Sequence, residues 1–190
     1  MQQPRPRAKT LPRRPRAATA AGAVPDLPQG ALQPLPGLDY GVLEQLMGYA
    51  LRRAQNALYL HFQHTLGRDA EVSPQRFAAL VLVARNPGLR QGVLADAMGV
   101  HRSGGLRLVD WLCAQDWVRR ENDPLDGRSW TLHPTPCGHA AVVRLTAAVQ
   151  AHDAALVQSL GPQGAALKPL LERLAAAARR QASVSGRTAA

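Results

Sequence analysis

A charged segment between two β-type runs constrains the fold of this 190-residue chain more than any other feature. The segment covers residues 123–129 and reads Asp-Pro-Leu-Asp-Gly-Arg-Ser, with short runs at 117–121 and 129–133 on either side. Asp, Pro and Gly favour turns, so the pattern predicts a β-hairpin with a charged tip. Helical patterns precede the hairpin directly and resume at Thr135. This order is typical of a winged helix-turn-helix, which sets one helix in the major groove of DNA and the hairpin tip against the minor groove.

Apolar residues spaced three and four apart predict four helices before the hairpin, over residues 39–66, 73–85, 91–98 and 102–115. Asp39 and Ser73 are expected to cap the first two helices, and Gly67 and Gly99 to end the first and third. The third and fourth helices, joined by the turn at Gly99, form the predicted helix-turn-helix. The first helix would be about 40 Å long, which is more than the small neighbouring core covers, so a second chain is a reasonable partner.

Two Ala- and Leu-rich helices are expected after the hairpin, over residues 136–160 and 162–181, with Pro169 kinking the second. The predicted fold is therefore mainly α with a small β-hairpin wing. It consists of a winged helix-turn-helix at 70–134 and a helical dimerisation layer from both ends of the chain, 39–68 and 136–182. The folded domain would span residues 37–182, and 183–190 would be a disordered tail.

Residues 1–36 form a Pro-rich arm that holds six basic residues and one acidic residue, about half of the net charge of +10. The arm is either a solvated disordered leader or a segment that touches DNA phosphates. The excess of positive charge suits a polyanionic partner, either nucleic acid or an anionic membrane surface. No apolar stretch approaches the roughly 20 residues of a membrane span, so the sequence analysis excludes one. Cys113 and Cys137 form neither a metal-ligand pattern nor a disulfide framework, which favours a reducing cytoplasm.

The order and spacing of these elements resemble the MarR family of bacterial transcription regulators. The resemblance covers about residues 40–174 and is carried by Pro74-Gln75-Arg76-Phe77, Gly88-Leu89-Arg90-Gln91, Leu94-Ala95, Met98-Gly99-Val100, Arg107-Leu108-Val109-Asp110, Asp123-Pro124-x-Asp126-Gly127-Arg128 and Thr135-x-x-Gly138. It implies a homodimer that binds double-stranded DNA at a pseudo-palindromic operator, usually as a repressor. It also implies release of the DNA when a small aromatic acid enters a crevice between the dimer layer and the winged module.

The chain departs from the family pattern at two helix starts. Arg90 and His101 stand where the family usually places capping residues, so both helix starts are expected to lack a side-chain cap. Gly104 and Gly105 replace larger residues in the first turn of the recognition helix, at a cost of about 1 kcal/mol each in helix propensity. They would let the backbone come close to DNA, or leave the helix to order only on binding.

Six residues are candidates for DNA binding: Arg102, Ser103, Arg107, Arg120, Asp126 and Arg128. Arg102 and Arg107 would contact a guanine edge or a phosphate, and Ser103 a phosphate or a base edge. Asp126 would shape the hairpin tip and aim Arg128 at the minor groove, although a solvated turn arginine paired with Asp126 is the simpler alternative. Arg120 would contact phosphate or be plain surface charge.

Tyr49, Arg53, His61 and Trp111 are candidates for an effector site, since an arginine beside aromatic residues suits a carboxylated aromatic ligand. An equally simple interpretation puts the aromatic side chains in the core and the arginine in solvent. No cofactor is expected, and a metal site at His61 and His64 lacks a third ligand.

No nucleophile elbow, phosphate loop or dinucleotide fingerprint appears, so we do not expect an enzyme. Two alternatives to a ligand-responsive repressor stay open. One is an architectural DNA-binding protein without an effector, which would show little sequence discrimination and a steep salt dependence. The other is a redox-sensing regulator that uses Cys137, which lies in the first turn of a helix, or Cys113.

Overall fold

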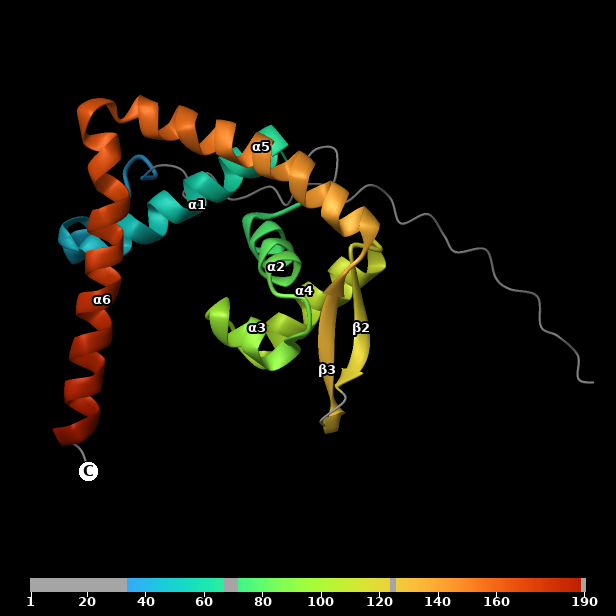
Figure 1. Ribbon diagram of the computed structural model, residues 1–190. Coiled ribbons are helices and arrows are strands. Elements are labelled where there is room, and N and C mark those ends of the chain that lie inside the picture. The colour runs from blue at the N-terminus through green and yellow to red at the C-terminus, as the bar shows by residue number, and fades with distance from the viewer. Residues whose placement is uncertain (1–33, 67–71, 124–125, 189–190) are drawn as a thin grey trace, which may run out of the picture.

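The computed structural model describes residues 34–66, 72–123 and 126–188, with the side chains of 126–128 and 183–188 excepted. Most of the basic arm, Gly67 and residues 124–125 of the hairpin tip therefore lie outside the described part. The chain forms two layers (Figure 1). α1, α5 and α6 make a helical layer, and α2, α3, α4 and the hairpin make the winged module beneath α1 and α5.

The elements run in the order η2 (Gly41–Gln45), α1 (Met47–Leu66), α2 (Pro74–Arg85), β1 (Leu89–Arg90), α3 (Gln91–Ala97), α4 (Arg102–Ala114), β2 (Val118–Asp123), β3 (Asp126–Pro134), α5 (Pro136–Ser159), η3 (Gly161–Gln163) and α6 (Gly164–Thr188). This arrangement confirms the predicted fold class, a winged helix-turn-helix between N- and C-terminal helices. The cap expected at Ser73 is also confirmed, because its side chain accepts a hydrogen bond from Arg76 N, and Thr135 caps α5 in the same way by accepting from Gly138 N.

The first helix starts later than the sequence analysis predicted. Asp39 Oδ1 accepts a hydrogen bond from Gly41 N at 2.8 Å, and Gly41 has a φ of +52°, which ends the continuity of the predicted helix. A 3₁₀ turn follows, Leu46 is extended, and α1 begins at Met47. The predicted helix over 39–66 is therefore wrong at its N-terminal end, and the 20 residues of α1 span about 30 Å.

The hairpin belongs to a three-stranded sheet with the order β1-β3-β2. β2 and β3 pair antiparallel from Val118↔Pro134 to Asn122↔Trp130, as the hairpin prediction required. β1, which the sequence analysis did not predict, adds Leu89↔Leu132 on the other side of β3. It consists of two residues, too few for an alternating pattern to appear in the sequence.

One apolar core joins the two layers. Leu80, Leu94, Leu112 and Leu132 have no exposed surface and come from α2, α3, α4 and β3. The same cluster includes Phe62 of α1 together with Ala141 and Leu145 of α5. The position of the winged module therefore depends on the helical layer through direct side-chain packing.

The recognition helix α4 crosses α3 at very short distance. Gly99 follows the end of α3 and begins the turn between the two helices with a φ of +63°. Gly105 is buried, and a Cβ added to it would lie 2.7 Å from the Cβ of Ala95 on α3. The interpretation that this glycine brings the backbone close to DNA is wrong, because Gly105 faces α3. As expected, Arg90 and His101 precede α3 and α4 without a side-chain hydrogen bond that caps the helix.

The C-terminal helix extends further than predicted. α6 contains Pro169 and continues to Thr188, so the disordered tail expected at 183–190 is wrong for residues 183–188. The run of alanines at 175–178, followed by Arg, Arg and Gln, has high helix propensity and supports this extension.

The helical layer exposes large apolar side chains over several elements. They include Val42, Leu43, Leu46, Met47 and Leu51 at the N-terminal end, and Val157, Leu160, Leu167, Leu170 and Leu171 in α5 and α6. Within the described ranges, one helix, α5, also has the length and mean hydropathy of a possible membrane span, with 24 residues and a value of 1.2. By length and composition, α5 is therefore an exception to the expectation that no segment could span a membrane. Two charged residues, Arg144 and Asp153, lie within its apolar sequence.

The close crossing of α3 and α4 predicts the effect of a single methyl group. Gly105→Ala should cost about 1–3 kcal/mol of unfolding free energy, because α3 or α4 has to move to admit the new Cβ. Urea denaturation measures this. Gly92→Ala in α3 is the control, since no atom lies within 4 Å of its added Cβ. It should be neutral or slightly stabilising. Equal effects for the two variants would contradict the proposed crossing.

Candidate nucleic-acid interface

The N-terminal half of α4 presents the three predicted DNA-binding residues to solvent. Arg102, Ser103 and Arg107 are all exposed. Ser103 and Arg107 are four residues apart and lie on one side of the helix, where both line a large groove. Arg102 lines a different cleft, which the start of α3 and the hairpin also line. The recognition helix therefore offers two chemically distinct faces.

The ends of β2 and β3 that are farther from α5 lie at the lower end of the winged module in Figure 1. Asp126 and Arg128 lie in the first residues of β3, but their side chains are outside the described part of the chain. The role of Arg128 in the minor groove therefore stays a prediction.

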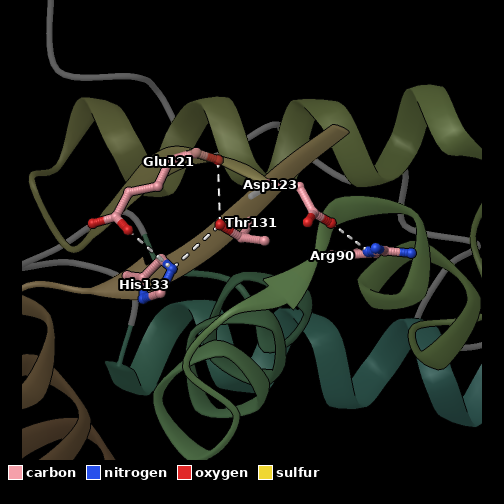
Figure 2. A network of polar contacts seen from close by, with 5 residues as sticks. All are labelled: Arg90, Glu121, Asp123, Thr131 and His133. Carbon is pink, nitrogen blue, oxygen red and sulfur yellow. Dashed lines mark hydrogen bonds and ion pairs between the residues drawn. The ribbon is translucent and has the colours of Figure 1, made fainter. Parts of the chain in front are cut away.

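An ion pair that the sequence analysis missed fixes the hairpin to the start of α3. Arg90 Nε donates to Asp123 Oδ2 at 2.6 Å, as Figure 2 shows. The Asp123 side chain is 4% exposed and that of Arg90 is 50% exposed. A carboxylate buried to this degree requires a hydrogen-bonded cation, so the pair holds the hairpin close to its tip.

A second set of polar contacts joins the two long strands on one face of the sheet. The Thr131 hydroxyl donates to the Glu121 carbonyl oxygen at 3.2 Å (Figure 2). His133 Nε2 lies 3.3 Å from the Thr131 hydroxyl and 3.4 Å from Glu121 Oε2. These contacts link the two paired strands and support the register of the hairpin.

Arg120 serves the structure rather than the surface. Its Nη2 donates to Asp110 Oδ1 on the recognition helix, and its side chain is 27% exposed. Its Nε is buried and has no hydrogen-bond partner among the described residues. Arg120 was expected to contact phosphate or to be plain surface charge. Its pair with Asp110, which is 53% exposed, ties β2 to α4, because alternation along β2 directs Arg120 to the same face of the sheet as Leu132.

A groove of about 1050 Å³ lies between the helical layer and the recognition helix. Its walls come from α1, α2 and the α3–α4 turn, and include Tyr59, Gln63, Arg76, His101, Ser103 and Arg107. Gln63 Nε2 donates to the Tyr59 hydroxyl at 3.1 Å, whereas Gln63 Oε1 is buried without a partner in the described part of the chain. Arginine, histidine and tyrosine side chains around an open volume suit an anionic ligand with an apolar body.

The four residues predicted for the effector site do not line this groove. Tyr49 and Arg53 line a separate cavity of about 250 Å³ beside Tyr40. Trp111 packs edge-on against Trp117, with ring centroids 5.4 Å apart. None of the cavities formed by the described residues is lined by all four of these side chains, so an effector site shared by them stays a prediction.

Arg76 is the residue that links the groove to these aromatic rings. Its Cζ lies 4.2 Å from the centroid of the Trp111 ring, a cation–π geometry. The helical spacing of α2 places Arg76 on the first turn behind the Ser73 cap, but only the fold shows what it contacts.

His61, the remaining effector candidate, pairs with His152 across α1 and α5. Their Nδ1 and Nε2 atoms are 2.7 Å apart, so one ring donates and the other accepts. Burial, and next the neighbouring His61, lower the pKa of His152, whereas Asp153 acts in the opposite direction. The pair is thus a contact between helices in the helical layer.

The cysteines differ in environment. Burial raises the pKa of the Cys113 thiol, against a smaller lowering by Arg120, so this thiol is poorly suited to react as a thiolate. Cys137 is exposed in the first turn of α5. In the described ranges no three His, Cys, Asp or Glu side chains gather in a way that would hold a metal ion.

Three comparisons with known proteins agree with this geometry. A model of the MarR family matches residues 71–129. A protein of Thauera aromatica assigned to transcriptional regulation of the hcr operon is 36% identical over 119 residues, which cover 63% of this chain and 72% of that protein. The structure of the transcriptional repressor CouR bound to a 23-mer DNA duplex is 32% identical, with a TM-score of 0.65, and the match covers 74% of this chain and 98% of that one.

A second structure of CouR contains p-coumaroyl-CoA. It is 31% identical to this chain, with a TM-score of 0.65, and the match covers 75% of this chain and 98% of that one.

The Arg90–Asp123 pair predicts that one arginine matters more than its neighbour. Arg90→Ala should cost about 1–3 kcal/mol, because it leaves the buried Asp123 carboxylate without this charged partner. Arg119→Ala is the matched control, since Arg119 pairs with Glu121 at 2.5 Å in an exposed position. Its cost should stay within about 1 kcal/mol. Chemical denaturation and amide exchange in β3 measure both, and a larger loss for Arg119→Ala would contradict this assignment.

Proposed function

The chain belongs to the MarR family of transcriptional regulators, and on that premise we propose that it is a homodimeric repressor in the cytoplasm that binds a pseudo-palindromic operator and leaves it when an aromatic ligand binds. The family is one of transcriptional regulators and not of enzymes. The observation that carries the proposal is the exposed set Arg102, Ser103 and Arg107 at the start of α4, beside a hairpin that two ion pairs hold in place.

The two ion pairs support DNA binding because they fix the hairpin relative to the recognition helix. Arg90–Asp123 joins the hairpin to α3, and Arg120–Asp110 joins it to α4. A protein that contacts two adjacent grooves of DNA needs a fixed separation between the hairpin and the recognition helix, since its phosphate and base contacts have to form together. We propose that Arg128 enters the minor groove from the hairpin tip, and that Arg107 reads the major groove.

The groove between the layers is the proposed effector site. The p-coumaroyl-CoA held by CouR suggests an aromatic acid or its thioester as the ligand class. Arg76 and Arg107 would attract the anionic part, and Tyr59 would pack against the ring. Because Ser103 and Arg107 belong to both the groove and the recognition helix, a ligand here would compete directly with DNA for these side chains.

A second copy of the chain would cover the exposed apolar side chains of the helical layer. Two-fold pairing of this layer would set two recognition helices side by side, which matches a palindromic site. A redox-sensing function receives less support, because burial raises the pKa of Cys113 and Cys137 has no described cysteine partner.

Dimerisation is the first test. Sedimentation at micromolar concentration should show a species of about 40 kDa, twice the chain mass of 20.4 kDa. Leu170→Glu should shift it to the monomer, because it buries a charge in the proposed interface. Leu106→Glu on α4 is the control, with a similar exposure of 42% against 53%, and should leave the dimer intact. A monomeric wild-type protein would rule out this assembly.

DNA recognition is the second test. Arg107→Ala should weaken operator binding by about 1–3 kcal/mol and relax base preference at one position in each half-site. Arg128→Ala should reduce affinity most for operators with A·T-rich flanks, which have the narrow minor groove. Titrations against the operator, a flank-altered operator and random DNA distinguish the roles. Identical losses on all three DNAs would instead favour an architectural protein that reads only charge.

A further inference from the structure

A second cleft, of about 400 Å³, lies at the start of α3 and is lined by residues of α3, by Arg102 of the recognition helix and by Ser129 and Trp130 of the hairpin. Its walls combine the aromatic ring of Trp130 with Val93, Gln91 and three charged residues, Arg90, Arg102 and Asp96. It lies apart from the proposed effector groove, with which it shares Asp96 alone among the described lining residues.

Trp130 is the feature of this cleft that needs an explanation. Its side chain is 48% exposed, whereas Trp117 is 8% exposed and Trp111 packs against Trp117. Trp130 pairs with Asn122, and alternation along β3 puts it on the same face of the sheet as the fully buried Leu132. It therefore lies on the face of the sheet that packs on the helices and lines the cleft at the start of α3, but it is not part of the apolar core.

The position of the cleft identifies its occupant. α4 would occupy the major groove and the hairpin tip the minor groove, so the DNA strand that separates the two grooves has to pass between them. The cleft lies at the start of α3 and has both Arg102 of α4 and Trp130 of the hairpin in its lining, so it is open to that strand. A deoxyribose offers an apolar face for an indole, and its phosphate seeks cations.

The charges of the cleft agree with this occupant. Arg102 and Arg90 face one carboxylate, Asp96, so the balance is positive. Arg90 gives its Nε to Asp123, and its side chain remains 50% exposed. Gln91 Oε1 is buried without a hydrogen-bond partner among the described residues, an acceptor that a water molecule in the cleft could satisfy.

We propose that Trp130 packs its ring on a deoxyribose of the DNA strand between the two grooves, while Arg102 and Arg90 hold the flanking phosphate. The inference rests on the proposed DNA-binding function and adds a contact that positions the protein without reading a base. Because a deoxyribose is present at every step, the contact strengthens binding to operator and random DNA equally.

Binding and tryptophan fluorescence test this together. The probes are an operator duplex selected from random sequences and an unselected 30-base-pair duplex. Trp130→Ala should weaken binding to both duplexes about tenfold, as expected for removing a buried aromatic contact. The slope of affinity against salt should not change, since no charge is lost. Arg102→Ala should lower that slope by about 0.9 for the phosphate contact removed.

Fluorescence identifies the residue directly. In the wild-type dimer, either duplex should protect part of the emission from acrylamide. Trp130→Phe should lose this protection, whereas Trp111→Phe, the matched control, should keep it.

Each outcome is decisive. Binding of DNA with Trp130 still open to acrylamide, or unchanged affinity in Trp130→Ala, would overturn the inference and leave the proposed function intact. A wild-type protein that binds neither duplex would overturn the proposed function as well.

Discussion

The Thr135 hydroxyl is the contact on which the arrangement of the two layers depends. It donates to the carbonyl oxygen of Asp116 at 2.5 Å and accepts from the backbone of Gly138 at 3.0 Å, while Thr135 N donates to Trp117 O at 3.0 Å. One residue thus joins the end of the recognition helix, the base of the hairpin and the start of α5. A shift of α5 in the helical layer is therefore passed to both DNA-facing elements, because the junction is 8% exposed and has little room to relax.

Local chemistry made most of the fold predictable. Ser73 and Thr135 cap their helices and Gly99 ends α3, because caps and turns are decided by neighbours within a few residues. The break at Gly41 and the strand β1 escaped prediction. The first depends on one backbone angle inside a periodic pattern, and the second is too short to carry a pattern of its own.

In the candidate site, too, local features could be predicted and contacts between distant residues could not. Helical spacing correctly left Arg102, Ser103 and Arg107 on the surface. It could not show that Arg90 meets Asp123, a partner 33 residues away, or that Tyr59 and Arg76 line one groove while Tyr49 lies elsewhere. Contacts between distant elements depend on how the elements pack, such as the close approach of α3 and α4 at the buried Gly105, which the spacing of apolar residues does not show.

The exposed apolar side chains of the helical layer would make the stability of the protein depend on its concentration in the cell. When a second copy covers them, the free energy of folding includes the free energy of association, so stability rises with concentration. A chain made at low copy number would spend more time as an unpaired protomer, open to proteases and unable to span both half-sites. Repression would then respond more steeply to the expression level than it would for a permanent dimer. The reason is that, at low concentration, the amount of dimer follows the square of the monomer concentration.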